Sequence, residues 1–163
     1  MKREIKFRGK ITSDNLEELI SCELEIPHKD GWVVGSFVEP NIITGNVVDI
    51  DWDFFATEWW AKVIPETIGQ FTGLKDKNGV EIYEGDIFHL GDKNITYTVV
   101  WHDTGLRGKQ NGASNYVGIE HWKRHIEIIG NIHDKNKQKQ ALIDMMRGDE
   151  ELELYDDNPE LLK

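Results

Sequence analysis

The sequence has 163 residues, of which 39% are hydrophobic and 30% charged, and its net charge at pH 7 is −11. A chain of this length buries about 68–70% of its unfolded surface on folding, so it needs no disulfide or metal for stability. The single cysteine, Cys22, excludes an internal disulfide framework and a cysteine-rich zinc site. Residues 1–10 lack the apolar core of a signal peptide, and no run of about 18 apolar residues occurs. We therefore expect a soluble cytoplasmic protein that makes no membrane contact.

The charge is spread unevenly along the chain. Residues 1–10 carry five basic side chains and one acidic one, whereas residues 11–60 carry one basic and eleven acidic side chains, a net charge of −10. Affinity for nucleic acid depends mainly on neutralising phosphate, so this balance disfavours a nucleic-acid-binding protein. That class stays an alternative, because a local basic face would form if the first and last strands paired. Its members would be Lys2, Arg3, Lys6, Arg8, Lys123 and Arg124.

The first elements are a strand and a short helix. Alternation of polar and apolar side chains predicts a strand over Glu4–Arg8. Within residues 11–30, Asp14 is placed to cap a helix and Glu17 to complete a capping box. The apolar stripe of this helix is Leu16, Leu19 and Ile20. Leu24–Ile26 is then expected to form a strand.

The next segments are read as strand, turn and strand. Gly31–Val38 is expected to form a strand, Asn41–Gly45 a turn, and Asn46–Phe55 a second strand.

Three carboxylates, those of Asp49, Asp51 and Asp53, would point to one side of that second strand. Such a face offers the oxygen ligands that Mg²⁺ and Ca²⁺ prefer. The calcium-loop pattern fails, however, because Phe54 stands where that loop needs glycine. We interpret the carboxylates as a solvated face, and a metal-dependent enzyme that uses them stays a less favoured alternative.

No other residues form a recognisable catalytic or metal-binding pattern. His121 and His125 are four residues apart, which suits zinc binding on a helix, but the sequence that follows them has strand character. No serine lies in a G-x-S-x-G elbow, and no phosphate-binding G-x-x-x-x-G-K-[ST] loop occurs. We therefore expect no catalytic residues, no metal and no cofactor, and a protein that is not an enzyme.

Adjacent aromatic pairs are a further signal. Phe54-Phe55 and Trp59-Trp60 are neighbours, and neighbouring residues on an extended chain point in opposite directions. One member of each pair should be exposed or held in an interface unless both sides are covered. Aromatic side chains on a small barrel also grip peptides or stack on bases, but we favour core positions for them.

The stretch from residue 70 to residue 87 predicts two tight turns in succession. Asn78-Gly79 is the dipeptide that most readily forms a type I′ turn between paired strands, and Glu84-Gly85-Asp86 predicts the second turn. The glycine-rich segment Thr104–Asn115 is expected to be a mobile loop. Short strands are expected near residues 68–74, 80–83, 86–91, 95–102, 116–119 and 124–132.

Residues 135–156 predict a second helix. Leu142, Met145 and Met146 follow helical spacing, and Gly148 is placed to end the helix. A helix of about 13 residues is marginal in isolation and needs a surface to pack on. It can fold back on its own chain or cross to another copy. We favour the second arrangement, and therefore self-association.

Three pieces of the sequence resemble the YopX family, small proteins encoded mainly by phages and prophages. They are REIKFRGK (Arg3–Lys10), WAKVIPETIGQFTGLKDKNGVEIYEGDIF (Trp60–Phe88) and IEIIGNIHD (Ile126–Asp134), with DNPELL (Asp157–Leu162) at the end. The resemblance implies a largely β protein whose main body is an SH3-like barrel, and it brings no catalytic residues. Residues 11–30 and 135–156 look like insertions relative to similar proteins. The signature positions, which we interpret as structural, are Gly73, Asp76, Asn78, Gly79, Tyr83, Glu84, Gly85, Asp86, Gly130 and Asn131.

The resulting prediction is a mainly β fold with minor α. We expect an N-terminal β segment with an inserted helix (1–67), an SH3-like small β-barrel core (68–134), and an inserted helix with an acidic tail (135–163). For function we expect a non-enzymatic phage or prophage accessory protein of the bacterial cytoplasm, which binds a macromolecule, most simply another protein, and forms a homo-oligomer. A nucleic-acid-binding barrel and the metal-dependent enzyme remain the alternatives.

Overall fold

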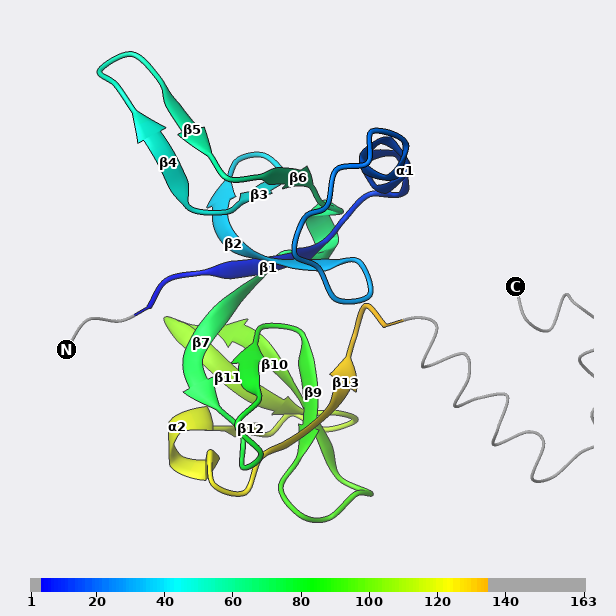
Figure 1. The fold of residues 1–163 in the computed structure, drawn as a ribbon. Helices are drawn as coiled ribbons and strands as arrows, with labels where there is room; N and C mark the ends of the chain where they lie inside the picture. Colours follow the sequence, from blue (N-terminus) through cyan, green and yellow to red (C-terminus); the bar gives the residue numbers. More distant parts are fainter. Residues whose placement is uncertain (1–3, 135–163) are drawn as a thin grey trace, which may run out of the picture.

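The computed structural model describes residues 4–134. These residues form two main β-sheets, one above the other in Figure 1, and a two-stranded hairpin that projects from the upper sheet. The predicted second helix and the acidic tail lie outside the described residues. Within the described range, no helix is both long enough and apolar enough to span a membrane.

The first sheet has six strands in the order β6-β3-β2-β1-β7-β8, all paired antiparallel. Helix α1 (Ser13–Ser21) follows β1, and a short 3₁₀ helix, η1 (Pro65–Thr67), precedes β7. The strands are β1 (Phe7–Lys10), β2 (Trp32–Val38), β3 (Ile42–Thr44), β6 (Trp60–Lys62), β7 (Gly69–Lys75) and β8 (Glu81–Tyr83). The core of this sheet is Ile11, Val33, Ile43, Ala61 and Val63.

The second sheet has five strands in the order β12-β11-β10-β9-β13, again all antiparallel. Its strands are β9 (Asp86–His89), β10 (Thr96–His102), β11 (Gly105–Gln110), β12 (Tyr116–Val117) and β13 (Glu127–Asn131). Helix α2 (Ile119–Trp122) lies between β12 and β13. The core here is Ile82, Phe88, Val99, Ile119 and Ile126. Because Ile82 belongs to β8, the edge strand of the first sheet contributes to the core of the second.

The mainly β fold class with short helices is confirmed. The strand orders leave both sheets open, so the described residues do not close a barrel through hydrogen bonds. The hypothetical pairing of the first and last strands is wrong, because β1 pairs with β2 and β7 whereas β13 pairs with β9. That pairing therefore does not bring together the described members of the basic face, Lys6, Arg8, Lys123 and Arg124, while Lys2 and Arg3 lie outside the described residues. The division of the chain at residues 67 and 134 stays a prediction.

Two local predictions near α1 need correction. The helix is capped by Thr12, whose hydroxyl accepts a hydrogen bond from the Asn15 N–H at 3.3 Å, rather than by Asp14, which lies inside the helix. Thr12 has the extended backbone that an N-cap requires. Leu24–Ile26 is not a strand, because no strand pairs with it.

The segment Thr104–Asn115 was expected to be a loop, and this is wrong, because β11 occupies half of it. All six residues of β11 pair with β10. A Cβ atom at Gly108 would lie 2.6 Å from the Phe88 ring, so glycine stands in this strand because an aromatic ring packs against its backbone.

The turn between β7 and β8 also differs from the predicted type I′ turn. Gly79 has a φ of +81°, but Asn78 does not have positive φ, and a type I′ turn requires it at both positions. The Gly79 N–H donates to the Asp76 carbonyl at 3.1 Å, and the Asp76 N–H donates to the Val80 carbonyl at 2.8 Å. This pattern fits a three-residue hairpin loop with glycine in the left-handed position.

We predict that Gly79→Val lowers the free energy of unfolding by about 1–2 kcal/mol, because a β-branched residue resists positive φ. No neighbouring atom lies within 4 Å of a Cβ at this position, so the loss arises from backbone strain alone. Gly79→Asn is the matched control and should lose less, since asparagine tolerates this conformation. Chemical denaturation measures both values, and equal losses would contradict the assignment.

Candidate functional site

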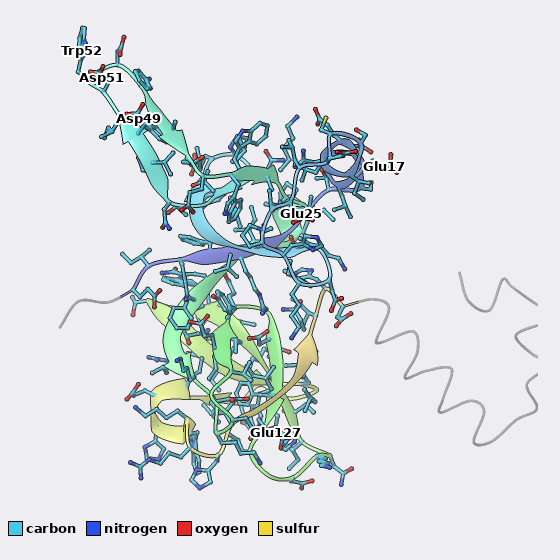
Figure 2. The ribbon with its side chains drawn as sticks, in the orientation of Figure 1. Glu17, Glu25, Asp49, Asp51, Trp52 and Glu127 are labelled. Carbon is cyan, nitrogen blue, oxygen red and sulfur yellow. The ribbon has the colours of Figure 1, made fainter. Side chains whose placement is uncertain are left out.

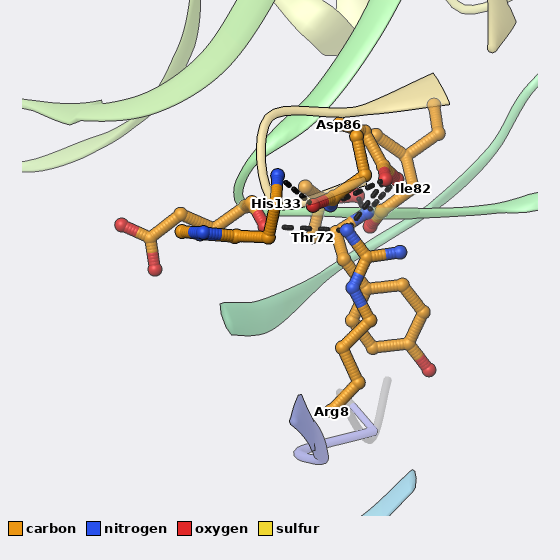
Figure 3. Close-up of polar contacts among 8 residues, drawn as sticks. Arg8, Thr72, Ile82, Asp86 and His133 are labelled. Carbon is orange, nitrogen blue, oxygen red and sulfur yellow. Dashed lines mark hydrogen bonds and ion pairs between the residues drawn. The ribbon is translucent and has the colours of Figure 1, made fainter. Parts of the chain in front are cut away.

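A buried ion pair joins the two sheets. Arg8 on β1 reaches Asp86 at the start of β9, and the Nη2–Oδ1 distance is 2.5 Å (Figure 3). The Asp86 Oδ2 atom accepts the Tyr83 N–H at 2.8 Å, and the Asn131 side-chain amide donates to Oδ1 at 3.4 Å. The Arg8 guanidinium also lies 4.8 Å from the centre of the Tyr83 ring. We call Arg8, Tyr83, Asp86 and Asn131 the seam cluster.

The seam cluster is buried, and this burial shifts the pKa values of two of its members. Asp86 is 2% exposed, and burial raises the pKa of its carboxyl above the ordinary value, although the charge of Arg8 and the hydrogen bonds oppose the rise. Burial, reinforced by the Glu81 carboxylate, raises the pKa of the Tyr83 hydroxyl. The Asp86 oxygens are occupied by partners from β1, β8 and β13. The cluster therefore acts as a structural joint.

A second carboxylate, that of Asp76, ties the β7–β8 turn to β13. Its Oδ1 atom accepts the N–H groups of Asn78 and Val80 at 2.8 and 2.9 Å, and its Oδ2 atom accepts the Ile128 N–H at 3.1 Å. Four further signature residues lie in the turns beside these two carboxylates, whereas Gly73 lies within β7. The four are Asn78, Gly79, Glu84 and Gly85. Gly85 takes a φ of +92° in the β8–β9 turn, and Gly130 lies at the β-bulge of β13. Most of the signature thus lies at the seam between the sheets.

We predict that Asp86→Ala lowers the free energy of unfolding by about 3–5 kcal/mol, because it leaves the part-buried Arg8 cation without its counter-ion. The control is Glu120→Ala, which removes the exposed partner of Lys123 and should cost about 1 kcal/mol or less. Denaturant titration of both variants gives the two losses. Similar values would mean that Asp86 does not join the sheets.

The structure brings an unexpected apolar surface together on the projecting hairpin, which we define as residues 46–58. The ladder between β3 and β6 continues outward, since Gly45 N–H donates to Trp59 O and Glu58 N–H donates to Asn46 O, each at 2.9 Å. Strands β4 (Val47–Ile50) and β5 (Phe55–Thr57) then pair only with each other. One long hairpin therefore has its base in the first sheet and its outer half alone in solvent (Figure 1).

The outer half of this hairpin exposes large apolar side chains. Trp52 is 92% exposed and Ile50 75% exposed, and four further side chains are each more than half exposed. These four are Val47, Val48, Phe54 and Phe55. The expectation that the Phe54-Phe55 aromatics fill the core is wrong for both residues. At the base of the hairpin, Trp59 is partly buried and packs on the first core, while Trp60 is 51% exposed.

The three predicted carboxylates lie on the same hairpin, but they do not share a strand face. Asp49 is in β4, whereas Asp51 and Asp53 lie in the turn between the strands, so the continuous strand over Asn46–Phe55 is wrong. The Asp51 carboxylate accepts the Trp52 N–H at 2.7 Å and so helps to form the turn. Figure 2 shows Asp49, Asp51 and Trp52 near the outer end of the hairpin, away from the two main sheets.

The histidine pair does not form a metal centre either. His121 lies in α2 and His125 beyond it, and both rings pack edge-on against Trp122. Across residues 4–134, no three His, Cys, Asp or Glu side chains are grouped closely enough to hold a metal ion. The projecting hairpin was missed because its turn residues were read as a continuation of a strand. The sequence signal was the polar Asp51 and Asp53 on either side of Trp52.

The described chain is thus a mainly β protein of two joined sheets with a projecting apolar hairpin. It belongs to the YopX family, because the family model described as YopX protein matches residues 38–138, more than half of the sequence. The match includes the projecting hairpin but not β1 or α1. Among solved structures, the chain is similar to the crystal structure of protein EF1440 from Enterococcus faecalis, with 21% identity and a TM-score of 0.48. That similarity covers 84% of this chain and 99% of the other. No curated protein matches the chain.

Proposed function

We propose that this protein is a non-enzymatic binding module of a phage or prophage, that its partner is another protein, and that the projecting hairpin makes the contact. The observation that carries this proposal is the exposure of six large apolar side chains on the outer half of one hairpin. Leaving such side chains in water forgoes about 1.5–3 kcal/mol of burial for each. Large apolar side chains gathered in the open on one element are typical of interaction sites.

The composition of the hairpin favours a protein partner. Trp52, Phe54 and Phe55 are of the kind that anchors protein interfaces, where aromatic side chains contribute most of the binding energy. The neighbouring aspartates would repel phosphate, so they disfavour nucleic acid.

Three basic residues of the alternative nucleic-acid face also favour a protein partner over nucleic acid. Lys6 bonds to Glu81 at 2.6 Å, Arg8 binds Asp86, and Lys123 binds Glu120 at 2.8 Å. These three cations are therefore already paired with carboxylates of the same chain, and Lys123, which follows α2, lies on a different element from Lys6 and Arg8.

The positions of the two buried groups with raised pKa values support a non-enzymatic role. Tyr83 and Asp86 carry raised pKa values, but both are held in the seam cluster, where every Asp86 oxygen already has a partner. Their perturbation follows from burial at a structural joint.

The proposal predicts that Ile50→Ser/Trp52→Ser/Phe54→Ser abolishes partner binding without unfolding the protein. The tagged full chain is used for affinity purification from its bacterial host, and the retained protein is then titrated against purified variants. Removing aromatic anchors from an interface should weaken binding by about 30-fold or more. The variant should melt like the unchanged protein, because these side chains contact neither core.

The matched control is Trp101→Ser, which removes a tryptophan that is 56% exposed on β10 of the other sheet. It should bind the partner normally. Equal binding by the hairpin variant and the unchanged chain would contradict the proposal, as would equal weakening by Trp101→Ser.

A further inference from the structure

A groove lies between α1 and the base of the projecting hairpin. One part of it has a volume of about 330 Å³ and is lined by residues of α1, of the segment 24–26 and of the stretch 57–60. A second hollow of about 350 Å³ lies beside it and shares Leu19, Leu24, Glu25 and Ile26 with the first. We call the two hollows together the α1 groove. Its floor is mainly apolar, with Trp59 and Trp60 at one end.

The rim of the α1 groove is acidic. Glu18, Glu25 and Glu58 line it, and all three side chains are exposed. Residues 11–60 supply every residue that lines the two hollows, and they contain eleven acidic side chains and one basic one. An apolar floor with such a rim fits an occupant that combines apolar side chains with lysine or arginine.

The chain itself contains a segment with this chemistry outside the described residues. Residues 135–147, KNKQKQALIDMMR, carry four basic side chains and one acidic one. Their apolar residues include Leu142, Ile143, Met145 and Met146. Methionine adapts readily to irregular apolar surfaces. The charges and the apolar content of this segment are therefore complementary to those of the α1 groove.

The position where the described chain ends also favours this occupant. In Figure 1 the segment after β13 turns toward the first sheet and ends on the side of the view that carries α1. Eight residues, from Lys135 to Leu142, span up to about 26–29 Å when extended. Attachment to the same chain also raises the effective concentration of the segment at the groove.

We propose that the α1 groove is the binding site for residues 135–147 of the same chain. This contact lies beyond the proposed function, since it is intramolecular and does not involve the tip of the projecting hairpin. The sequence favoured a crossing to another copy, because residues 135–156 look like an insertion outside the compact body of similar proteins. The groove, its charge and the exit of the chain assign the segment to its own protomer instead.

Cys22 provides a reporter for this contact, because it is the only cysteine, is exposed and lines the groove. The full chain is labelled at Cys22 with a benzophenone maleimide, irradiated and digested, and its cross-links are mapped by mass spectrometry. Mixing ¹⁵N-labelled and unlabelled chains distinguishes cross-links within a chain from those between chains. We expect cross-links to residues 135–147 within one chain. The same label on Ser114→Cys in a Cys22→Ser chain should give none, since Ser114 lies in the β11–β12 loop.

Charge reversal tests the chemistry of the contact. Glu18→Lys/Glu25→Lys should lower the cross-link yield about fivefold, the effect of losing two exposed ion pairs. Asp49→Lys/Asp53→Lys makes the same charge change at the tip of the hairpin and should leave the yield unchanged. Lys137→Glu/Lys139→Glu should also lower the yield, and combining it with Glu18→Lys/Glu25→Lys should restore it.

Cross-links between chains, or none to residues 135–147, would overturn the proposal. Equal yields in the groove and hairpin-tip variants, or no recovery in the combined variant, would also overturn it. None of these results bears on partner binding by the projecting hairpin, so the two proposals fail separately.

Discussion

The buried carboxylate of Asp86 is the contact on which the arrangement of the two sheets depends. It receives Arg8 from β1, the Tyr83 N–H from β8 and the Asn131 amide from β13, so one side chain joins the first strand of the first sheet to the last strand of the second. An unpaired charge at such a position would be strongly destabilising, and the same is true of the guanidinium that faces it. Gly69 also allows the two sheets to approach each other. A Cβ at this position would lie 2.5 Å from the Glu84 carbonyl oxygen, so β7 can lie this close to the β8–β9 turn only because the residue is glycine.

The described residues consist of a body, which is the two joined sheets, and a projection, which is the hairpin of residues 46–58. Each sheet has its own apolar core, and the side chains of both cores lie at or near full burial. The hairpin of residues 46–58 starts from the first sheet, continues past its edge and exposes its apolar side chains where neither core reaches them. The proposed protein partner would cover these apolar side chains. Their position at the end of a hydrogen-bonded ladder places them on a defined support.

Much of this fold follows from the sequence because the strands from residue 69 onward are short and separated by strong turn signals such as Asn78-Gly79 and Glu84-Gly85-Asp86. The sequence predictions are wrong where the conformation of a residue depends on contacts with residues distant in the sequence, because local sequence patterns do not reveal such contacts. Gly108 resembles a loop residue, yet it lies in β11 because the Phe88 ring packs against its backbone. Asp51 and Asp53 continue a period of two, yet they form a turn, since the ladder from β3 and β6 already fixes the register of the hairpin. The exposed apolar site could not be predicted from the sequence either, because the burial of Trp52 and Phe55 depends on which strands cover them.

We propose that the outer half of the projecting hairpin serves binding and does not contribute to folding. The most direct test replaces residues 47–57 with an Asn-Gly turn, which keeps the Asn46–Glu58 rung of the ladder, and measures the free energy of unfolding by denaturant titration. We expect a value within about 0.5 kcal/mol of that of the unchanged chain, as for surface changes that remove no core contact. A loss of about 2 kcal/mol or more, the size expected when a core side chain is removed, would show that these apolar residues belong to the core and would contradict a binding role.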